Sequence, residues 1–95
     1  MIYAYIRVST KYQNIDRQYE EIKALDIDDR HIYIDKESGK DFDRTKYQKL
    51  IKKLKKDDLL IVKSIDRLGR NYHMILEEWA RITKTIGADI RVLDM

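Results

Sequence analysis

Apolar and polar positions alternate at the start of the chain and then change to a helical spacing. Ile2, Ala4, Ile6 and Val8 alternate with Tyr3, Tyr5 and Arg7, a pattern typical of a β-strand over residues 2 to 8. Further on, one face of a predicted helix carries Ile15, Tyr19, Ile22 and, less regularly, Leu25. The segment of residues 26 to 29, which contains three aspartates, then breaks this pattern.

The next segment repeats the order of strand and helix. Residues 31 to 35 are predicted as a short strand, and residues 36 to 43 as a polar loop in which Asp43 can cap the following helix. The apolar face of that helix consists of Tyr47, Leu50, Ile51 and Leu54, and the opposite side of Lys46, Lys49, Lys53 and Lys56. We expect the lysine side to be solvated.

The remainder of the chain contains a buried strand, a helix and a further strand. Leu59, Leu60, Ile61 and Val62 form an uninterrupted aliphatic run, as expected of a central strand that is buried on both faces. After a polar loop over residues 64 to 71, the helical period is kept by Ile75, Trp79, Ile82 and Ile86, and Gly87 is expected to end the helix as a C-cap. Residues 88 to 93 are predicted as the fourth strand.

The regular alternation of strands and helices predicts an α/β fold with a mainly parallel sheet, right-handed crossovers and helices on both faces. Ninety-five residues, 43% of them apolar, can bury one modest core, so we interpret residues 1 to 95 as one domain. The chain has no Cys, which excludes disulfides and thiolate metal sites and fits a cytoplasmic location. It also has no apolar run of membrane-spanning length.

The net charge of +3 is unevenly distributed along the chain. Residues 36 to 70 carry twelve basic and six acidic side chains, whereas residues 1 to 35 carry five basic and seven acidic ones. A polyanion would therefore be drawn to the middle of the chain, although a basic stretch of this size is also common in proteins that bind no nucleic acid.

Polar side chains follow three of the predicted strands at the point where each strand ends. The first strand ends in Arg7, Val8, Ser9 and Thr10, the second is followed by Asp35, Ser38 and Arg44, and the third by Ser64, Asp66, Arg67 and Arg70. Ligands of open parallel sheets bind beyond the carboxyl ends of the strands. We therefore expect the three clusters to face one crevice.

Arginines around hydroxyl groups suit a phosphate ligand, because the guanidinium is always charged and its planar fork matches phosphate oxygens. Preorganised arginine donors can stabilise the negative charge of a phosphoryl-transfer transition state without a metal. The nucleophile would then be a hydroxyl group. Ser9 is the best candidate, because it directly follows the first strand and Arg7 stands two residues before it.

Three blocks of residues resemble the motifs of the resolvase and invertase family of serine site-specific recombinases. The first motif of the family is matched by residues 5 to 10 of this chain, followed by Gln13, Asn14, Arg17 and Gln18. The second is similar to residues 35 to 39 with Asp43 and Arg44, and the third to residues 66 to 71. Three blocks in the same order and with the same spacing make the resemblance specific.

The resemblance implies a resolvase-like catalytic domain, for which we expect the strand order 2-1-3-4. It also implies that Ser9 attacks a DNA phosphodiester, forming a phosphoserine bond to the 5′ end, before strand exchange and religation. Arg7, Arg44, Arg67 and Arg70 would bind the phosphate, and Asp66 and Gln18 would orient groups or assist proton transfer. No ATP, metal or other cofactor is expected.

Family catalytic domains continue beyond the equivalent of residue 95 into a dimerisation helix and a DNA-binding domain. We therefore expect a truncated chain that is inactive in isolation. In an intact parent protein the resemblance implies DNA as the partner, together with a homodimer and a synaptic tetramer.

Other interpretations remain open for the same residues. Ser9 could be a turn or cap residue, Arg7 a structural partner of Asp35 or Asp66, and Asp66 a helix cap. Two other functions are a metal-dependent α/β nuclease module and a non-catalytic DNA-binding or regulatory domain. The nuclease would require carboxylates at the strand ends to hold magnesium, whereas the first strand ends in Arg and Ser.

Overall fold

The computed structural model describes residues 1–9, 15–37 and 44–94. The elements in chain order are β1 (Ile2–Ser9), α1 (Ile15–Lys23), η2 (Asp29–His31), β2 (Ile32–Glu37), α2 (Thr45–Lys53), β3 (Leu59–Val62), η3 (Ile65–Leu68), α3 (Tyr72–Ala80), η4 (Arg81–Ile86) and β4 (Asp89–Val92). The strands pair in parallel in the order β2-β1-β3-β4. The α/β fold class and the strand order 2-1-3-4 are therefore confirmed.

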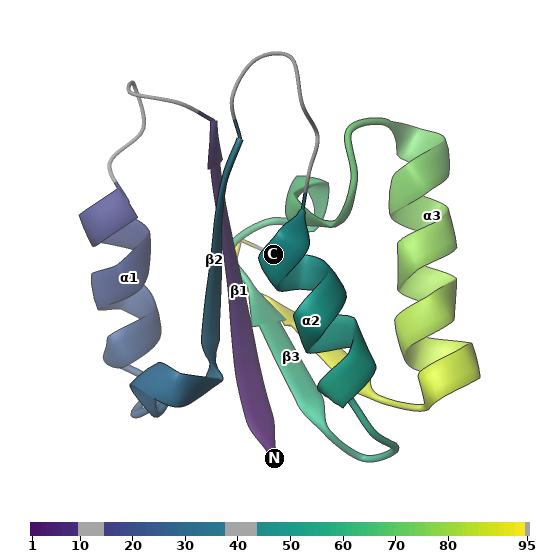
Figure 1. Ribbon diagram of the computed structural model, residues 1–95, viewed down its shortest axis with the longest axis horizontal. Coiled ribbons are helices and arrows are strands. Elements are labelled where there is room, and N and C mark those ends of the chain that lie inside the picture. The colour runs from purple at the N-terminus through teal and green to yellow at the C-terminus, as the bar shows by residue number, and fades with distance from the viewer. Residues whose placement is uncertain (10–14, 38–43, 95) are drawn as a thin grey trace.

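The helices cover both faces of the sheet, with α1 on one side and α2 and α3 on the other (Figure 1). Alternate residues of β1 supply the two cores, because side chains of a strand point to opposite faces. The core under α2 and α3 contains Tyr3, Tyr5, Tyr47, Leu50, Ile51, Leu54, Leu60, Val62, Leu68, Ile82 and Ala88. The core under α1 contains Ala4, Ile6, Val8, Ile22, Ile27 and Ile61.

The prediction of a central strand at residues 59 to 62 is confirmed. β3 lies between β1 and β4, and its residues Leu60, Ile61 and Val62 are at most 3% exposed. Because Leu60 and Val62 enter one core and Ile61 the other, this strand is buried from both sides.

The predicted division of α2 into two faces is also confirmed. The apolar residues Tyr47, Leu50 and Ile51 and the C-cap Leu54 are at most 5% exposed. The lysines Lys46, Lys49 and Lys53 are exposed on the opposite face, and Lys56 is also exposed but lies beyond the end of the helix, which is shorter than predicted. The helix is thus held by its apolar face, while the lysine face is open to solvent.

The third helix changes its winding before it ends. α3 continues into the π-helical segment η4, where the carbonyl of Ile82 accepts hydrogen bonds from the amides of both Gly87 (3.1 Å) and Ala88 (3.0 Å). Gly87 has a φ of 86°, in the left-handed region that glycine adopts without a Cβ penalty. The prediction that Gly87 is the C-cap is therefore confirmed.

The acidic segment after α1 differs from the sequence prediction. α1 ends at Lys23, and Leu25 is 38% exposed, so its predicted place on the core face is wrong. Asp26 turns the chain with a φ of 64°, and Ile27, at 4% exposed, enters the core instead. The sequence prediction continued the helical spacing beyond Lys23 and therefore placed Leu25 on the core face. The turn at Asp26 changes the direction of the backbone, so this spacing no longer applies.

The second strand begins and ends later than predicted. Asp28 caps the short helix η2 by accepting a hydrogen bond from the amide of Arg30 (2.8 Å), so His31 belongs to η2 and β2 begins at Ile32. The fourth strand, Asp89–Val92, is one residue shorter at each end than predicted.

The predicted cap Asp43 lies outside the described residues. None of the helices in the described segments is long and apolar enough to cross a membrane.

Candidate active site

The carboxyl ends of β1, β2 and β3 lie at one edge of the sheet, because the three strands are parallel. Ser9 is the last residue of β1, and its backbone pairs with Glu37 at the end of β2. The short helix η3 follows the end of β3, and α2 begins near the same end of the molecule (Figure 1). The other predicted polar residues of this edge, Thr10, Gln13, Asn14 and Ser38, lie outside the described residues.

Arg7 joins β1 to η3. Its Nη2 donates a hydrogen bond of 2.7 Å to the backbone carbonyl of Asp66. The carboxylate of Asp66 accepts a hydrogen bond from the Ser64 hydroxyl and lies 3.4 Å from Nη1 of Arg67. Arg7 therefore contacts the Asp66 backbone, while the Asp66 side chain is directed toward its own segment.

Arg44 binds the same segment through other carbonyls. It is 7% exposed, and its Nη1 donates to the carbonyls of Leu68 (2.7 Å) and Arg67 (3.4 Å). The guanidinium carbon lies 3.8 Å from the ring centroid of Tyr47, a distance typical of a cation–π contact. Two of the four predicted phosphate-binding arginines thus hold η3 through its backbone carbonyls.

Asp35 is the centre of a buried hydrogen-bond network at the end of β2. Its carboxylate accepts from the Tyr5 hydroxyl (2.8 Å) and from the backbone amides of Lys46 and Tyr47 (both 3.0 Å). The two amides belong to the first turn of α2, so Asp35 caps this helix from a neighbouring strand. Burial and the nearby Asp35 carboxylate raise the pKa of Tyr5 well above its usual range.

Arg67 lies in η3, which Arg7 and Arg44 hold, and Arg70 lies two residues after its end. The side chain of Arg67 is 15% exposed, and within the described part of the chain its buried Nε has no hydrogen-bond partner. Arg70 follows η3 and is exposed. An unpartnered buried donor is rare in proteins and is consistent with a missing acceptor at this position.

Gly69 and Asn71 determine how the chain passes from η3 into α3. A Cβ added to Gly69 would lie 2.7 Å from Cγ of Met74 and 2.9 Å from the amide nitrogen of Ile75, so only glycine allows this close approach. The side chain of Asn71 caps α3 by accepting a hydrogen bond of 2.8 Å from the amide of Met74. Both residues fall in the third sequence block.

Gln18 is the predicted site residue that α1 contributes. It lies on α1, which covers the opposite face of the sheet from α2. Its Oε1 is buried and has no hydrogen-bond partner among the described residues.

Two structural roles were not predicted from the sequence. Asp35 caps α2, and the hydroxyl of Tyr5 donates a hydrogen bond to Asp35. The only signal in the sequence was the spacing of two residues between Tyr5 and Arg7, because residues i and i+2 of a strand face the same side of the sheet. Within the segments 1–9, 15–37 and 44–94, no group of three or more His, Asp or Glu side chains could hold a metal ion.

These features define a parallel α/β domain with an arginine-rich segment fixed at the carboxyl edge of its sheet. A family model described as the resolvase N-terminal domain matches residues 2–95. The chain therefore belongs to the resolvase N-terminal domain family, as its three sequence blocks predicted.

Individual relatives agree with this assignment. The chain is 39% identical over 70 residues to a transposon Tn3 resolvase of Escherichia coli, covering 74% of this chain and 38% of the relative. It is 34% identical over 93 residues to a resolvase of Clostridium perfringens, covering 98% of this chain and 49% of the relative. A serine recombinase, gin, of Escherichia phage Mu is 40% identical over 76 residues, covering 79% of this chain and 38% of the relative. The chain thus spans about half or less of the length of these relatives.

Proposed function

We propose that this chain is the catalytic-domain part of a serine site-specific DNA recombinase. In the proposed reaction the Ser9 hydroxyl oxygen attacks a DNA phosphorus, and the bond from phosphorus to the 3′ oxygen breaks. The hydroxyl proton is lost from Ser9, and the departing 3′ oxygen gains a proton. The product is a phosphoserine bond to the 5′ end, and attack by the 3′ hydroxyl of another strand reverses the step.

The observation that carries the proposal is the position of Arg67. Its segment is held at the carboxyl edge by Arg7 and Arg44, and its buried Nε has no partner among the described residues. A phosphate oxygen would supply the acceptor that this donor lacks. Because the segment is fixed before any ligand binds, its donors are preorganised for the charge of the transition state.

The remaining predicted residues receive separate roles in the proposal. Arg70 is exposed beside η3 and would contact the phosphate directly, whereas Asp66 positions Arg67 through the contact of 3.4 Å. Arg7 and Arg44 hold η3 by its backbone carbonyls and are also proposed to take part in phosphate binding, as the resemblance to the family implies. Gln18 would orient groups from the α1 side.

The partners are proposed from the family and from the relatives that are named resolvases and recombinases. DNA is the proposed substrate, and a homodimer and a synaptic tetramer are the proposed assemblies of the working enzyme. Neither a metal nor another cofactor takes part in the proposed chemistry. The chain alone should bind DNA weakly, with strong salt dependence, because phosphate contacts release counterions.

The test uses a chimera in which this chain replaces the matching residues of the Clostridium perfringens resolvase. The chimera is incubated in EDTA with DNA that carries that resolvase's own site and a nick that traps the intermediate. We expect an SDS-resistant protein–DNA adduct that maps to Ser9 and is absent from Ser9→Ala. Arg67→Ala and Arg70→Ala should each lower the rate of adduct formation by about 10²-fold. The exposed Lys84 is the matched control, and Lys84→Ala should leave the rate unchanged.

Three results would overturn the proposal. They are normal adduct formation by Ser9→Ala, cleavage that requires magnesium, and specific DNA binding without any adduct. The second would favour a metal-dependent nuclease, and the third a non-catalytic DNA-binding domain.

A further inference from the structure

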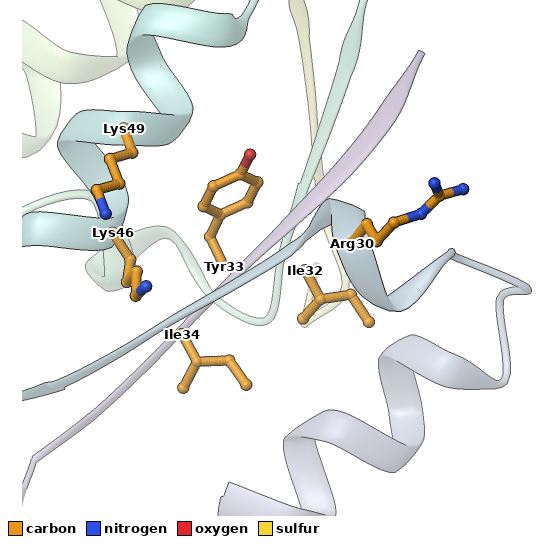
Figure 2. A pocket seen from close by; sticks show the side chains of 6 residues that line it. All are labelled: Arg30, Ile32, Tyr33, Ile34, Lys46 and Lys49. Atoms are coloured by element: carbon orange, nitrogen blue, oxygen red, sulfur yellow. The ribbon is translucent and has the colours of Figure 1, made fainter.

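A groove lies beside β2 and the lysine face of α2. It has a volume of about 350 Å³ and is lined by Arg30, Ile32, Tyr33, Ile34, Lys46 and Lys49 (Figure 2). We call it the β2-edge groove. None of its lining residues belongs to the candidate active site.

The lining shows that the groove follows the outer edge of the strand. Tyr33 packs on the core under α2, whereas Ile32 and Ile34 pack on the core under α1, so side chains from both faces of the sheet line it. Figure 2 shows the Tyr33 ring on the side of α2, and the two isoleucines on the opposite side of the strand. A groove that includes both faces must run along the backbone between them.

The backbone at this edge can pair with a further strand. In the described part of the chain β2 pairs with β1 on one side and ends the sheet on the other. An edge strand presents N–H and C=O groups outward, and these groups can bind an added strand from another molecule. The edge therefore favours an extended peptide as the occupant.

The positive charges around the groove favour a peptide with acidic side chains. Lys46 and Lys49 are exposed on one rim and Arg30 on the other, where Arg30 also pairs with Asp28 at 2.9 Å. The helix that carries the two lysines, residues 45–53, contains four lysines and no acidic residue. An occupant with acidic side chains would complement this rim.

Nucleic acid fits these observations less well than a peptide does. Phosphates would contact the lysines, but a phosphate backbone has no N–H donors for the outward carbonyls of β2. A peptide strand supplies both donors and acceptors, and its alternate side chains can place acidic groups on the lysine side. We propose that the β2-edge groove binds an extended acidic peptide segment of a partner protein, which adds to the sheet beside β2.

The probe for this proposal is a synthetic ten-residue peptide of alternating Glu and Val, labelled with a fluorophore. Fluorescence anisotropy measures its binding to the chain, and amide hydrogen exchange measures protection along β2. We expect binding together with slowed exchange at outward amides of residues 32 to 36. Replacing every Glu of the peptide by Lys should abolish binding.

Matched variants locate the site. The double variant Lys46→Glu and Lys49→Glu should weaken binding by about tenfold or more, the scale of removing two rim charge pairs. The control double variant Lys52→Glu and Lys84→Glu changes the net charge equally but alters no groove residue, and it should weaken binding by less than about threefold. Circular dichroism confirms that each variant is folded.

The proposal is overturned if the acidic peptide fails to bind or binds without protecting the β2 amides. It is also overturned if the two double variants weaken binding equally. A ten-residue oligothymidine that binds the groove lysines and displaces the peptide, with no amide protection, would assign the groove to nucleic acid. Concentration-dependent protection without peptide, matched by dimers in sedimentation, would assign it to self-association.

Discussion

Two cationic regions of this molecule lie near the first turn of α2, and they differ in how their charges are held. At the carboxyl edge, Arg44 is 7% exposed, binds two backbone carbonyls and lies on a tyrosine ring. At the β2-edge groove, Lys46 and Lys49 are exposed on a solvated helix face. Charge alone therefore does not characterise a site, because the cation of the first region is held in one geometry by buried contacts, whereas the cations of the second are solvated.

The largest expected effect comes from removing the most buried cation. Arg44→Ala would leave the carbonyls of Arg67 and Leu68 without this donor and would remove the contact with Tyr47, so we expect a loss of about 3 kcal/mol in the free energy of unfolding. Arg44→Lys should recover less than half of this loss, since a lysine cannot match the planar contacts. Urea denaturation measures both variants.

The control for Arg44 is a cation of the solvated face. Lys53→Ala should change the free energy of unfolding by less than about 0.5 kcal/mol. If Arg44→Ala costs no more than Lys53→Ala, the contrast between a fixed and a solvated cationic region is wrong.

The next largest effect is expected at Asp35. Asp35→Ala would remove the cap of α2 and leave the Tyr5 hydroxyl without its acceptor, which should lower the free energy of unfolding by about 2 kcal/mol. Amide exchange should also become faster at Lys46 and Tyr47, whose N–H groups the carboxylate binds. The exposed Asp89 on β4 offers a control, and Asp89→Ala should have almost no effect on either measurement.

Stability at high pH tests the burial of two tyrosines in the arginine region. Burial is the main cause that raises the pKa of Tyr5 and of Tyr47 above the ordinary 10.0, followed by the neighbouring carboxylates Asp35 and Glu78. Above about pH 10 the unfolded chain loses these protons while the folded chain keeps them. Stability should therefore fall with rising pH, by about 1.4 kcal/mol per pH unit for each tyrosine.

Single variants separate the two contributions. Tyr5→Phe should halve the part of the slope that depends on these tyrosines, and Tyr47→Phe should do the same. Thermal denaturation between pH 9 and pH 12 provides the slopes. An unchanged slope in both variants would contradict the burial of the two hydroxyls.

The smallest effect is expected at the β2-edge groove. Lys49→Ala should change the free energy of unfolding by less than about 0.5 kcal/mol, because this side chain is exposed and contributes little to the stability of the folded state. Its substitution should instead weaken binding of the acidic probe peptide. A large loss of stability in Lys49→Ala would show that the groove lysines also have a structural role.

Local patterns along the chain predicted most of the fold. The aliphatic run at residues 59 to 62 identified the central strand, and the spacing of Tyr47, Leu50, Ile51 and Leu54 identified the buried face of α2. These predictions succeeded because periodicity reports burial directly. Element boundaries were less accurate: Leu25 was wrongly assigned to the core, because a turn at Asp26 redirects the chain after α1 ends.

The candidate site could be predicted only as a set of residues. Sequence motifs predicted the strand order, and local patterns placed the arginines and Ser9 at the strand ends. Ser9 was expected directly after the first strand, whereas β1 extends by one residue and ends at Ser9. The folded chain alone shows that Arg7 and Arg44 hold η3 by its carbonyls and that Asp35 caps α2. It also shows that α1, which contains Gln18, covers the opposite face of the sheet from α2. The reason is physical: backbone carbonyls and helix amides are present at every residue, so no pattern of side chains shows which of them a distant arginine or carboxylate will bind once the strands pair.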